Sequence, residues 1–183
     1  MLNSFGIRCS DAILSLQDYS FDEGECAFLI EELQGTIRWE VAPLYEELIG
    51  HLAKGPCFFP TRKNQIERWF ENSGLRIFAA RKDGRVVGYM AVCDEAETFL
   101  ANRSDVINIC GAYVLPEYRH TGVAKQLLDT VAKESMEEGY RYLGVDYETV
   151  NPTALRFWTK YFAPYTYSFI RRIDERMGQY EAR

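Results

Sequence analysis

The sequence predicts an α/β protein in which helices flank one mixed sheet. Residues 75–81 and 85–93 favour two strands, and Asp83-Gly84 between them is a pair suited to a tight primed hairpin turn. After this hairpin, strand-like and helix-like patterns alternate along the chain. The segment 106–147 is therefore expected to form a right-handed strand–helix–strand crossover whose two strands are parallel.

The composition is typical of a single folded domain. The 183 residues include 47% hydrophobic and 14% aromatic side chains, which is enough to bury a sizeable core. The net charge of −6 argues against a general nucleic-acid surface. The five cysteines are an odd number without a CxxC pair, which indicates a reducing compartment and no zinc site. The sequence has no signal peptide and no apolar run of about 18 residues, so we expect a cytoplasmic protein that does not enter a membrane.

The N-terminal part of the sequence predicts mostly helices. Residues 7–16 favour one or two short strands or a brief helix. Apolar side chains recur at helical spacing in residues 25–34 and again in residues 44–52, which indicates two helices. Asn64, with Glu67 three residues later, is typical of a capping box that opens a third helix.

A short turn links the strand expected over residues 106–114 to the helix that follows it. Gly122 in this turn has no Cβ to block an approaching phosphate, and Ala124 keeps its neighbourhood small. The amides of the first helical turn have no intrahelical acceptor, and the helix dipole gives them partial positive charge. The turn between Arg119 and Lys125 is therefore predicted to bind an anion such as a phosphate.

The C-terminal part of the sequence continues the alternation. Residues 142–147 favour a strand, and Asn151-Pro152 is suited to open a helix that continues to about Tyr161. Pro164 interrupts the helical pattern. The alternating apolar residues from 165 to 173 predict a final strand.

Two blocks of this sequence carry a resemblance to a known family. The turn Arg119–Ala124 is similar to the acetyl-CoA signature Arg/Gln-x-x-Gly-x-Gly/Ala of the GCN5-related N-acetyltransferase (GNAT) superfamily, and the helix Asn151–Trp158 is similar to that family's Asn-x-x-Ala-x-x-(apolar)-Tyr helix. The resemblance covers about residues 75–174. It implies the GNAT fold: a mixed, mostly antiparallel sheet with a parallel β-α-β cofactor unit, flanked by helices, here with an N-terminal helical extension. It also implies acetyl-CoA as co-substrate and no metal.

The resemblance further implies which residues bind CoA. Main-chain amides of the turn would hold the pyrophosphate, and the backbone at the end of the preceding strand would pair with the pantetheine arm. One of those strand amides can also hold the thioester carbonyl as it becomes an oxyanion. Asn151 matches the position that contacts the cofactor arm, but it also suits a helix N-cap before Pro152, and both roles can hold together. The predicted cofactor-binding residues are Tyr113, Val114, Arg119, His120, Thr121, Gly122, Val123, Ala124, Lys125, Asn151 and Trp158.

At the position of the usual proton donor for the thiolate leaving group, this sequence differs from the family pattern. Many relatives use the Tyr of the second block, where this sequence has Trp158, whose indole N–H donates a hydrogen bond but does not release a proton. Tyr161, one helical turn further on, is the nearest replacement, although a packing role is the alternative. Tyr113 and Tyr147 are further options, and water is another.

The proton acceptor is expected on the strand that follows the cofactor helix. Asp146 and Glu148 lie at its end, on the same face, next to the gap where CoA would bind. A solvated strand end or a structural hydrogen bond is the alternative for both carboxylates. Cys110 is interpreted as a small core residue rather than a nucleophile, and His51 as a structural residue of an upstream helix.

The function implied is that of an acyl-CoA-dependent N-acyltransferase, which transfers acetyl to a primary amine by direct attack in a ternary complex. The alternative is a non-catalytic acyl-CoA-binding sensor or subunit. Residues 1–74 would be a largely helical extension or remnant, packed on an acetyl-CoA-binding core of residues 75–183 to form one compact domain. The expected partners are a small-molecule or peptide amine and, as a possibility, a second copy in a homodimer; nucleic acid and membrane are not expected.

Overall fold

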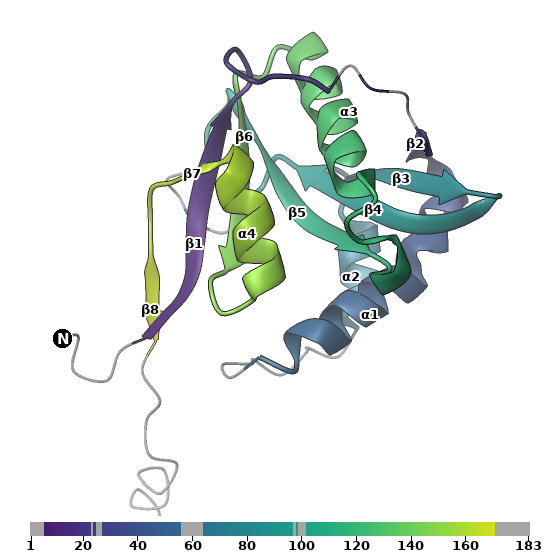
Figure 1. The fold of residues 1–183 in the computed structure, drawn as a ribbon, viewed down its shortest axis with the longest axis horizontal. Coiled ribbons are helices and arrows are strands. Elements are labelled where there is room, and N and C mark those ends of the chain that lie inside the picture. The colour runs from purple at the N-terminus through teal and green to yellow at the C-terminus, as the bar shows by residue number, and fades with distance from the viewer. Residues whose placement is uncertain are drawn as a thin grey trace, which may run out of the picture.

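The fold is one twisted sheet with helices on both faces (Figure 1). A computed structural model describes residues 6–22, 24, 27–55, 64–96, 98 and 102–170. The strands are β1 (Gly6–Ser15), β2 (Leu29–Leu33), β3 (Arg76–Lys82), β4 (Arg85–Cys93), β5 (Val106–Val114), β6 (Tyr142–Glu148), β7 (Ala163–Pro164) and β8 (Ser168–Ile170). The helices are α1 (Ala42–Leu52), α2 (Gln65–Glu71), α3 (Val123–Glu137) and α4 (Pro152–Tyr161), with 3-10 turns η1 (Gly35–Val41) and η2 (Pro116–Tyr118).

The strand order is β2-β3-β4-β5-β6-β1-β7, with β8 also paired to β1. Every described pairing is antiparallel except that of β5 with β6, which α3 connects. The β3–β4 hairpin turns at Asp83 and Gly84, whose φ angles of 52° and 79° are both positive, as a type I′ turn requires. The predicted hairpin, parallel pair and mixed sheet are therefore confirmed.

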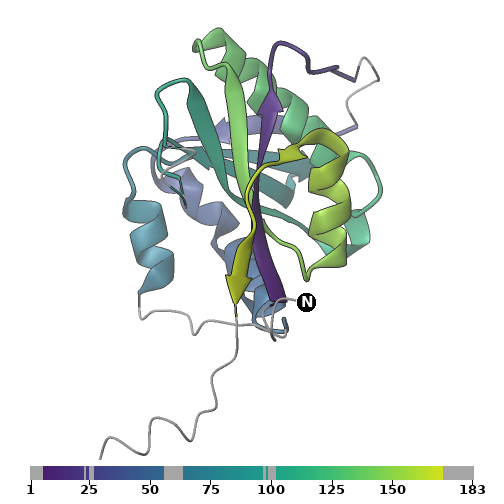
Figure 2. The ribbon, with the colours of Figure 1, turned by 90° about the vertical axis from the view of Figure 1, so that its left-hand side faces the viewer.

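Helices α1 and α2 cover one face of the sheet, and α3 and α4 cover the other (Figure 2). The central strands are consequently buried on both sides, and β4 is buried at every position after its first residue. On the α3 side, Leu127 and Leu128 are almost completely buried, because apolar residues at helical spacing form one stripe toward the sheet. On the other side, the Tyr45 and Trp69 rings stack with their centroids 4.4 Å apart.

The helix predicted over residues 25–34 is wrong, because Leu29–Leu33 form strand β2 at one edge of the sheet. Two adjacent glutamates of this strand are each held by an arginine of β3. Glu31 pairs with Arg81, and Glu32 accepts two hydrogen bonds from the Arg76 guanidinium. Cross-strand ion pairs of this kind stabilise a strand. Here they favour the strand over the helix that the spacing of a few apolar residues predicted.

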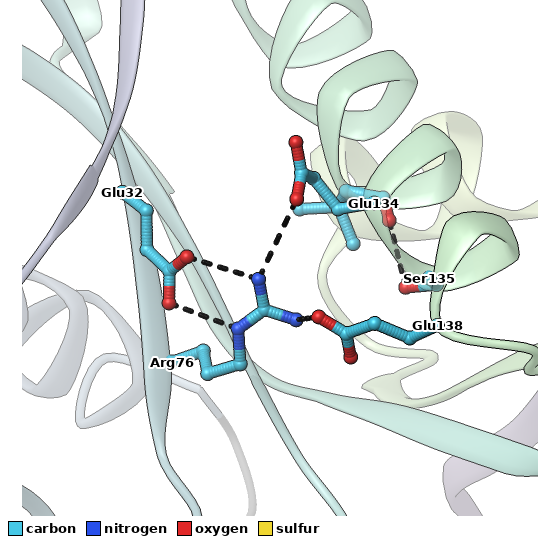
Figure 3. A network of polar contacts seen from close by, with 6 residues as sticks. Glu32, Arg76, Glu134, Ser135 and Glu138 are labelled. Atoms are coloured by element: carbon cyan, nitrogen blue, oxygen red, sulfur yellow. Dashed lines mark hydrogen bonds and ion pairs between the residues drawn. The ribbon is translucent and has the colours of Figure 1, made fainter.

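Arg76 also connects this edge of the sheet to the C-terminal end of α3 (Figure 3). Its Nε and Nη2 atoms each lie 2.9 Å from an oxygen of Glu32, its Nη1 donates to Glu138, and Nη2 lies 3.7 Å from Glu134. One cation is thus shared by three carboxylates from β2 and α3. It supplies positive charge at a helix C-terminus that has no basic residue in its own last turn.

Two further expectations differ from the structure in detail. Asn64 has a left-handed backbone (φ 61°) and makes no side-chain cap to α2, so the capping box is wrong. An N-cap residue normally has extended backbone, which brings its side chain to the first amides. The final strand is limited to Ser168–Ile170 among the described residues, and the rest of the predicted strand, up to residue 173, lies outside them.

Residues 7–16 resolve to one long strand, since β1 runs from Gly6 to Ser15 between β6 and the C-terminal strands. Both β1 and β2 come from the segment upstream of residue 75 and belong to the same sheet as the rest. The division of the chain at residue 74 stays a prediction. Within the described part of the chain, no helix has the length and apolar character needed to cross a membrane.

Candidate active site

Strands β5 and β6 separate halfway along their length. They are paired from Val106 opposite Tyr142 to Ile109 opposite Val145, after which β5 stays with β4 and β6 stays with β1. The separation coincides with a bulge in β5, where Cys110 is an extra residue between two pairs of the β4–β5 ladder. A cavity of about 900 Å³ occupies this split and extends to α1, α3 and α4. We call it the crevice; every sequence-predicted site residue except Thr121 lines it.

The N-terminus of α3 opens into the crevice without a cap. Its N-cap residue is Gly122, with φ 90°, and no side chain of the described residues hydrogen-bonds to its first amides. A Cβ added at Gly122 would have no protein atom within 4 Å, so this position faces open space. The amides of Val123, Ala124 and Lys125 have no intrahelical acceptor by helix geometry. Together with the helix dipole, they fit an anionic group such as the pyrophosphate of CoA.

Arg119 fastens the turn before α3 to the end of β5. Its Nε donates to the Val114 carbonyl oxygen at 3.1 Å, and its guanidinium lies 5.4 Å from the centre of the Tyr113 ring. The Tyr113 hydroxyl in turn donates to Glu47 of α1 at 3.0 Å. Burial and this carboxylate raise the pKa of Tyr113 above its usual value, which does not favour Tyr113 as the proton donor.

The side chains of Thr121 and Lys125 are occupied within the protein. Thr121 Oγ1 donates to the Tyr118 carbonyl at 2.6 Å and so closes the turn. The Lys125 ammonium forms an ion pair with Asp129 and lies over the rings of Tyr19 and Tyr161. At both positions the main-chain amide, rather than the side chain, is the group that the turn leaves for a ligand.

Asn151 caps α4, as one of the two predicted roles requires. Its Oδ1 accepts from the amides of Thr153 at 3.2 Å and Ala154 at 3.3 Å. Its Nδ2 therefore faces His51 Nε2 of α1, at 3.1 Å. Because Nδ2 can only donate, Nε2 accepts and the neutral imidazole carries its proton on Nδ1. The cofactor contact of Asn151 stays a prediction.

Trp158 and Tyr161 lie on the α4 side of the crevice. Trp158 is 7% exposed and makes edge-to-face contacts with Phe157 and Phe162 at 4.9 and 5.4 Å. Tyr161 packs against Phe157 at 5.3 Å, with the Lys125 ammonium 5.9 Å from its ring centre. Both residues thus have packing partners and also line the crevice, and the proton-donor role of Tyr161 stays a prediction.

The two predicted carboxylates stand at the β1–β6 side of the crevice. Glu148 forms an ion pair with Arg8 of β1 at 3.7 Å, and Asp146 lies directly opposite Asp11 in the strand register. Asp11 is buried and accepts hydrogen bonds from the hydroxyls of Thr98 and Thr166. Three carboxylates therefore gather at one side of the crevice, and the basic turn before α3 lies at another.

Cys110 is only partly buried. It is the bulged residue of β5, and it lines the crevice. Its thiol is hydrogen-bonded to Cys93 of β4; this bond and burial raise the pKa of Cys110 well above its usual value. Cys110 is therefore held as a thiol, which agrees with the prediction that it is not the nucleophile. Within the described ranges, no group of three or more His, Cys, Asp or Glu residues could hold a metal ion.

Two crevice residues escaped the sequence analysis. The sequence indicates only a structural role for His51, and the structure places it at the crevice, where its Nε2 lies 3.1 Å from Asn151 Nδ2. Asp11 lies in the segment whose secondary structure the sequence left open. No local signal marks either residue, because each reaches the crevice through the register of β1 or the packing of α1.

A family model supports what the geometry indicates. The model of the Acetyltransferase (GNAT) family matches residues 37–163, well over half of the chain. The chain belongs to the GNAT acetyltransferase family. The match includes both blocks on which the sequence resemblance rests, and it begins upstream of residue 75, within η1.

Solved structures share the GNAT fold of this chain at low sequence identity. A ribosomal-protein-alanine N-acetyltransferase from Brucella melitensis biovar Abortus 2308 has a TM-score of 0.59 and 22% identity, over 81% of this chain and 100% of that one. The aminoglycoside N-acetyltransferase AAC(6')-Iy in complex with CoA has a TM-score of 0.58 and 21% identity, over 80% and 99%. A functionally unknown conserved protein from Staphylococcus epidermidis ATCC 12228 has a TM-score of 0.63 and 13% identity. The match covers 90% of the present chain and 61% of the Staphylococcus protein, which is less than two thirds of that protein's length. No curated protein matches the chain by sequence.

Proposed function

We propose that this GNAT protein is an N-acetyltransferase that transfers acetyl from acetyl-CoA to a primary amine by direct attack in a ternary complex. The observation that carries this proposal is the uncapped N-terminus of α3 beside the split between β5 and β6. An anion site and an unpaired strand edge in one crevice suit a ligand that has a diphosphate at one end and an extended amide arm at the other.

The α3 side of the crevice would hold the cofactor. The amides of residues 123–125 would bind the pyrophosphate, and Arg119 would keep the turn against β5. Beyond Ile109, the β5 backbone no longer pairs with β6, so the segment Tyr113–Val114 would present to an extended arm the main-chain groups that neither β4 nor Arg119 occupies. Bound acetyl-CoA would supply the activated thioester. Asn151 and Trp158 would contribute from the α4 wall.

The β1–β6 side of the crevice would receive the amine. Asp11, Asp146 and Glu148 make this side acidic, and a negative potential attracts a protonated amine. The amine must lose a proton before it can attack, because an alkyl ammonium with a pKa of about 10.4 has no free electron pair. Asp146 or Glu148 would accept that proton, directly or through water. Both carboxylates line the crevice, and we assign the role to this pair.

The departing thiolate needs a proton from another group. Trp158 cannot release one, and we assign this role to Tyr161, which lines the same crevice from α4. If Tyr161→Phe retains full activity, water supplies the proton instead.

The test measures two quantities on the same preparation. Calorimetry with CoA reports the cofactor site, and thiol release from acetyl-CoA across a panel of small and peptidic amines reports transfer. CoA binding with thiol release that depends on one class of amine supports the enzyme. CoA binding without thiol release on any amine favours the non-catalytic acyl-CoA-binding alternative. Absence of CoA binding contradicts both.

A further inference from the structure

Tyr89 of β4 is completely buried, yet its hydroxyl has no hydrogen-bond partner among the residues that the structure describes. The ring of Trp69 of α2 lies 5.9 Å from the Tyr89 ring, centre to centre. Its Nε1–H is likewise buried without a described hydrogen-bond partner. Buried polar side-chain atoms in folded proteins nearly always have partners. Two adjacent exceptions therefore indicate a place that a ligand completes.

Both side chains meet at Gly111, the residue that follows the β5 bulge. A Cβ added at Gly111 would lie 3.5 Å from the Tyr89 hydroxyl oxygen and 3.2 Å from the Trp69 ring. Gly111 and Tyr89 both line the crevice. The unpartnered Tyr89 hydroxyl and the Trp69 ring thus lie next to a glycine of β5 at which this strand no longer pairs with β6.

The Tyr89 side chain lies on the face of the sheet that α1 and α2 cover. Trp69 stacks on Tyr45 of α1, and both Tyr45 and Tyr89 line the crevice from this face. The α3 N-terminus, which would hold the pyrophosphate, belongs to the layer on the opposite face (Figure 2). A second substrate that approaches from the α1–α2 face would meet Tyr89 before it reaches the centre of the split.

The protonation of Tyr89 defines what it can bind. Burial, followed by the neighbouring Tyr45, Cys110 and Tyr113, raises the pKa of Tyr89 well above its usual value of 10.0. The phenol therefore keeps its proton at neutral pH and offers an O–H donor, and indole Nε1–H is a donor only. Tyr89 lines the crevice, and its O–H donor matches an acceptor oxygen of a ligand, such as a hydroxyl or a carbonyl oxygen.

We propose that Tyr89, whose hydroxyl has no described partner and which lines the crevice, binds an oxygen atom of the acyl acceptor close to the amine that is acetylated. Tyr89 is then a specificity-determining residue that selects amines with a hydroxyl or carbonyl oxygen near the amino group. The acidic side chains Asp11 and Asp146 attract the amino group, while Tyr89 fixes the oxygen beside it. This inference rests on the proposed function, and it adds the class of acceptor.

The kinetic test uses Tyr89→Phe, which removes one oxygen atom and keeps the ring packing. Thiol release is compared for matched amines: 2-aminoethanol with propylamine, and glucosamine with cyclohexylamine. We expect kcat/KM for the oxygen-bearing member to fall at least about tenfold, mainly through KM, while the oxygen-free member changes less than about twofold. Tyr140→Phe, a tyrosine outside the crevice, is the control and should change neither. An equal loss for both members would assign Tyr89 to the acetyl thioester instead and overturn the proposal, as would no loss at all.

A binding test does not depend on turnover. Tyrosine labelled with 13C at Cζ gives a resonance for Tyr89, identified by its absence in Tyr89→Phe. We expect this resonance to shift when 2-aminoethanol or glucosamine is added, with or without CoA, and not when propylamine or cyclohexylamine is added. A shift without any acetyl transfer would keep the subsite and contradict the proposed enzyme. Transfer to an oxygen-bearing amine without a shift would contradict the subsite and keep the enzyme.

Discussion

Two helices begin at the crevice, and their N-termini are built in opposite ways. At α4, the N-cap residue Asn151 has extended backbone, and its side chain accepts hydrogen bonds from the second and third amides of the helix. At α3, the N-cap residue Gly122 has a φ of 90°, and no described side chain reaches the first amides. At α4, Pro152 has no N–H and the Asn151 side chain satisfies the next two amides, whereas the first amides of α3 have no such side-chain acceptor.

The difference indicates what each helix end contributes. A cap typically stabilises a protein by about 1 kcal/mol, so the α4 end serves stability and fixes one wall of the crevice. The α3 end lacks that stabilisation, and its first amides have no side-chain cap from the described residues. Glycine at this point both allows the backbone geometry and excludes the short polar side chains that would otherwise occupy the amides. The predictions below test this contrast, in order of decreasing effect.

The largest effect is expected from a negative side chain at the α3 end. Gly122→Glu should raise the dissociation constant of CoA at least about a hundredfold, because a carboxylate would oppose the diphosphate at the same amides. Gly139→Glu is a matched control, since Gly139 closes the same helix with a φ of 92°. Both variants should lose similar stability, roughly 1–2 kcal/mol for a left-handed non-glycine residue. Equal loss of CoA affinity in the two, measured by calorimetry, would contradict the anion site.

The C-terminal end of α3 offers a second comparison, because Arg76 supplies positive charge there. Arg76→Met leaves Glu32, Glu134 and Glu138 without their shared cation, and we expect the free energy of unfolding to fall by about 1–3 kcal/mol. CoA affinity should stay unchanged, because this cluster does not line the crevice. Urea unfolding and calorimetry check the two expectations separately.

The same cluster predicts a pH dependence of stability. The hydrogen bonds from Arg76 lower the pKa of Glu32 below its usual 4.5. A carboxyl with a lowered folded-state pKa stabilises the protein above the unfolded pKa, and this contribution is lost as the pH falls through the folded value. The wild type should therefore lose stability below about pH 4.5, and Arg76→Met should show a shallower decline. If the free energy of unfolding of the two proteins fell in parallel with pH, the decline would not come from Glu32.

A smaller effect is expected at the capped end. Asn151→Ala should lower the free energy of unfolding by about 1 kcal/mol, because Thr153 and Ala154 lose their acceptor. Asn151→Asp is the matched variant: it keeps an acceptor for these amides and should retain the stability, but it removes the donor to His51. Thermal unfolding of the two variants distinguishes the cap from the contact with His51.

The smallest effect is expected for Thr121→Ala. Its hydroxyl closes the turn from an exposed position and does not line the crevice, so stability should change by less than about 0.5 kcal/mol. CoA affinity should stay within about twofold, because the amides rather than this side chain would bind the phosphates. A loss above tenfold in calorimetry would show that the hydroxyl itself takes part.

Apart from the Asn64 capping box, the sequence predicted the features named here whose signals are local. Asp83-Gly84 specified its turn because few residues adopt two consecutive positive φ angles. The Arg119–Ala124 turn and the Asn151 cap were likewise visible, since each depends on residues within one helical turn of each other. The resemblance to the GNAT family rests on this turn and on the helix that Asn151 opens, and not on the Asp83-Gly84 hairpin.

The sequence failed where structure depends on distant partners. Strand β2 was predicted as a helix because its ion pairs with Arg76 and Arg81 join residues more than 40 positions apart. Asp11, His51 and Tyr89 reach the crevice from three different elements, and only strand register and helix packing bring them there. These three residues were therefore hidden from sequence, while the Arg119–Ala124 turn and the carboxylates Asp146 and Glu148 were not.

The bulge at Cys110 has a mechanical consequence. Beyond it, the sheet consists of two separate flaps, one that contains β4 with the end of β5 and one that contains β1 with the end of β6. The flaps can move apart without rupture of any ladder hydrogen bond, because none joins them beyond Ile109 and Val145. A wider crevice would therefore cost side-chain contacts across it, such as that between Asn151 and His51, rather than strand pairing.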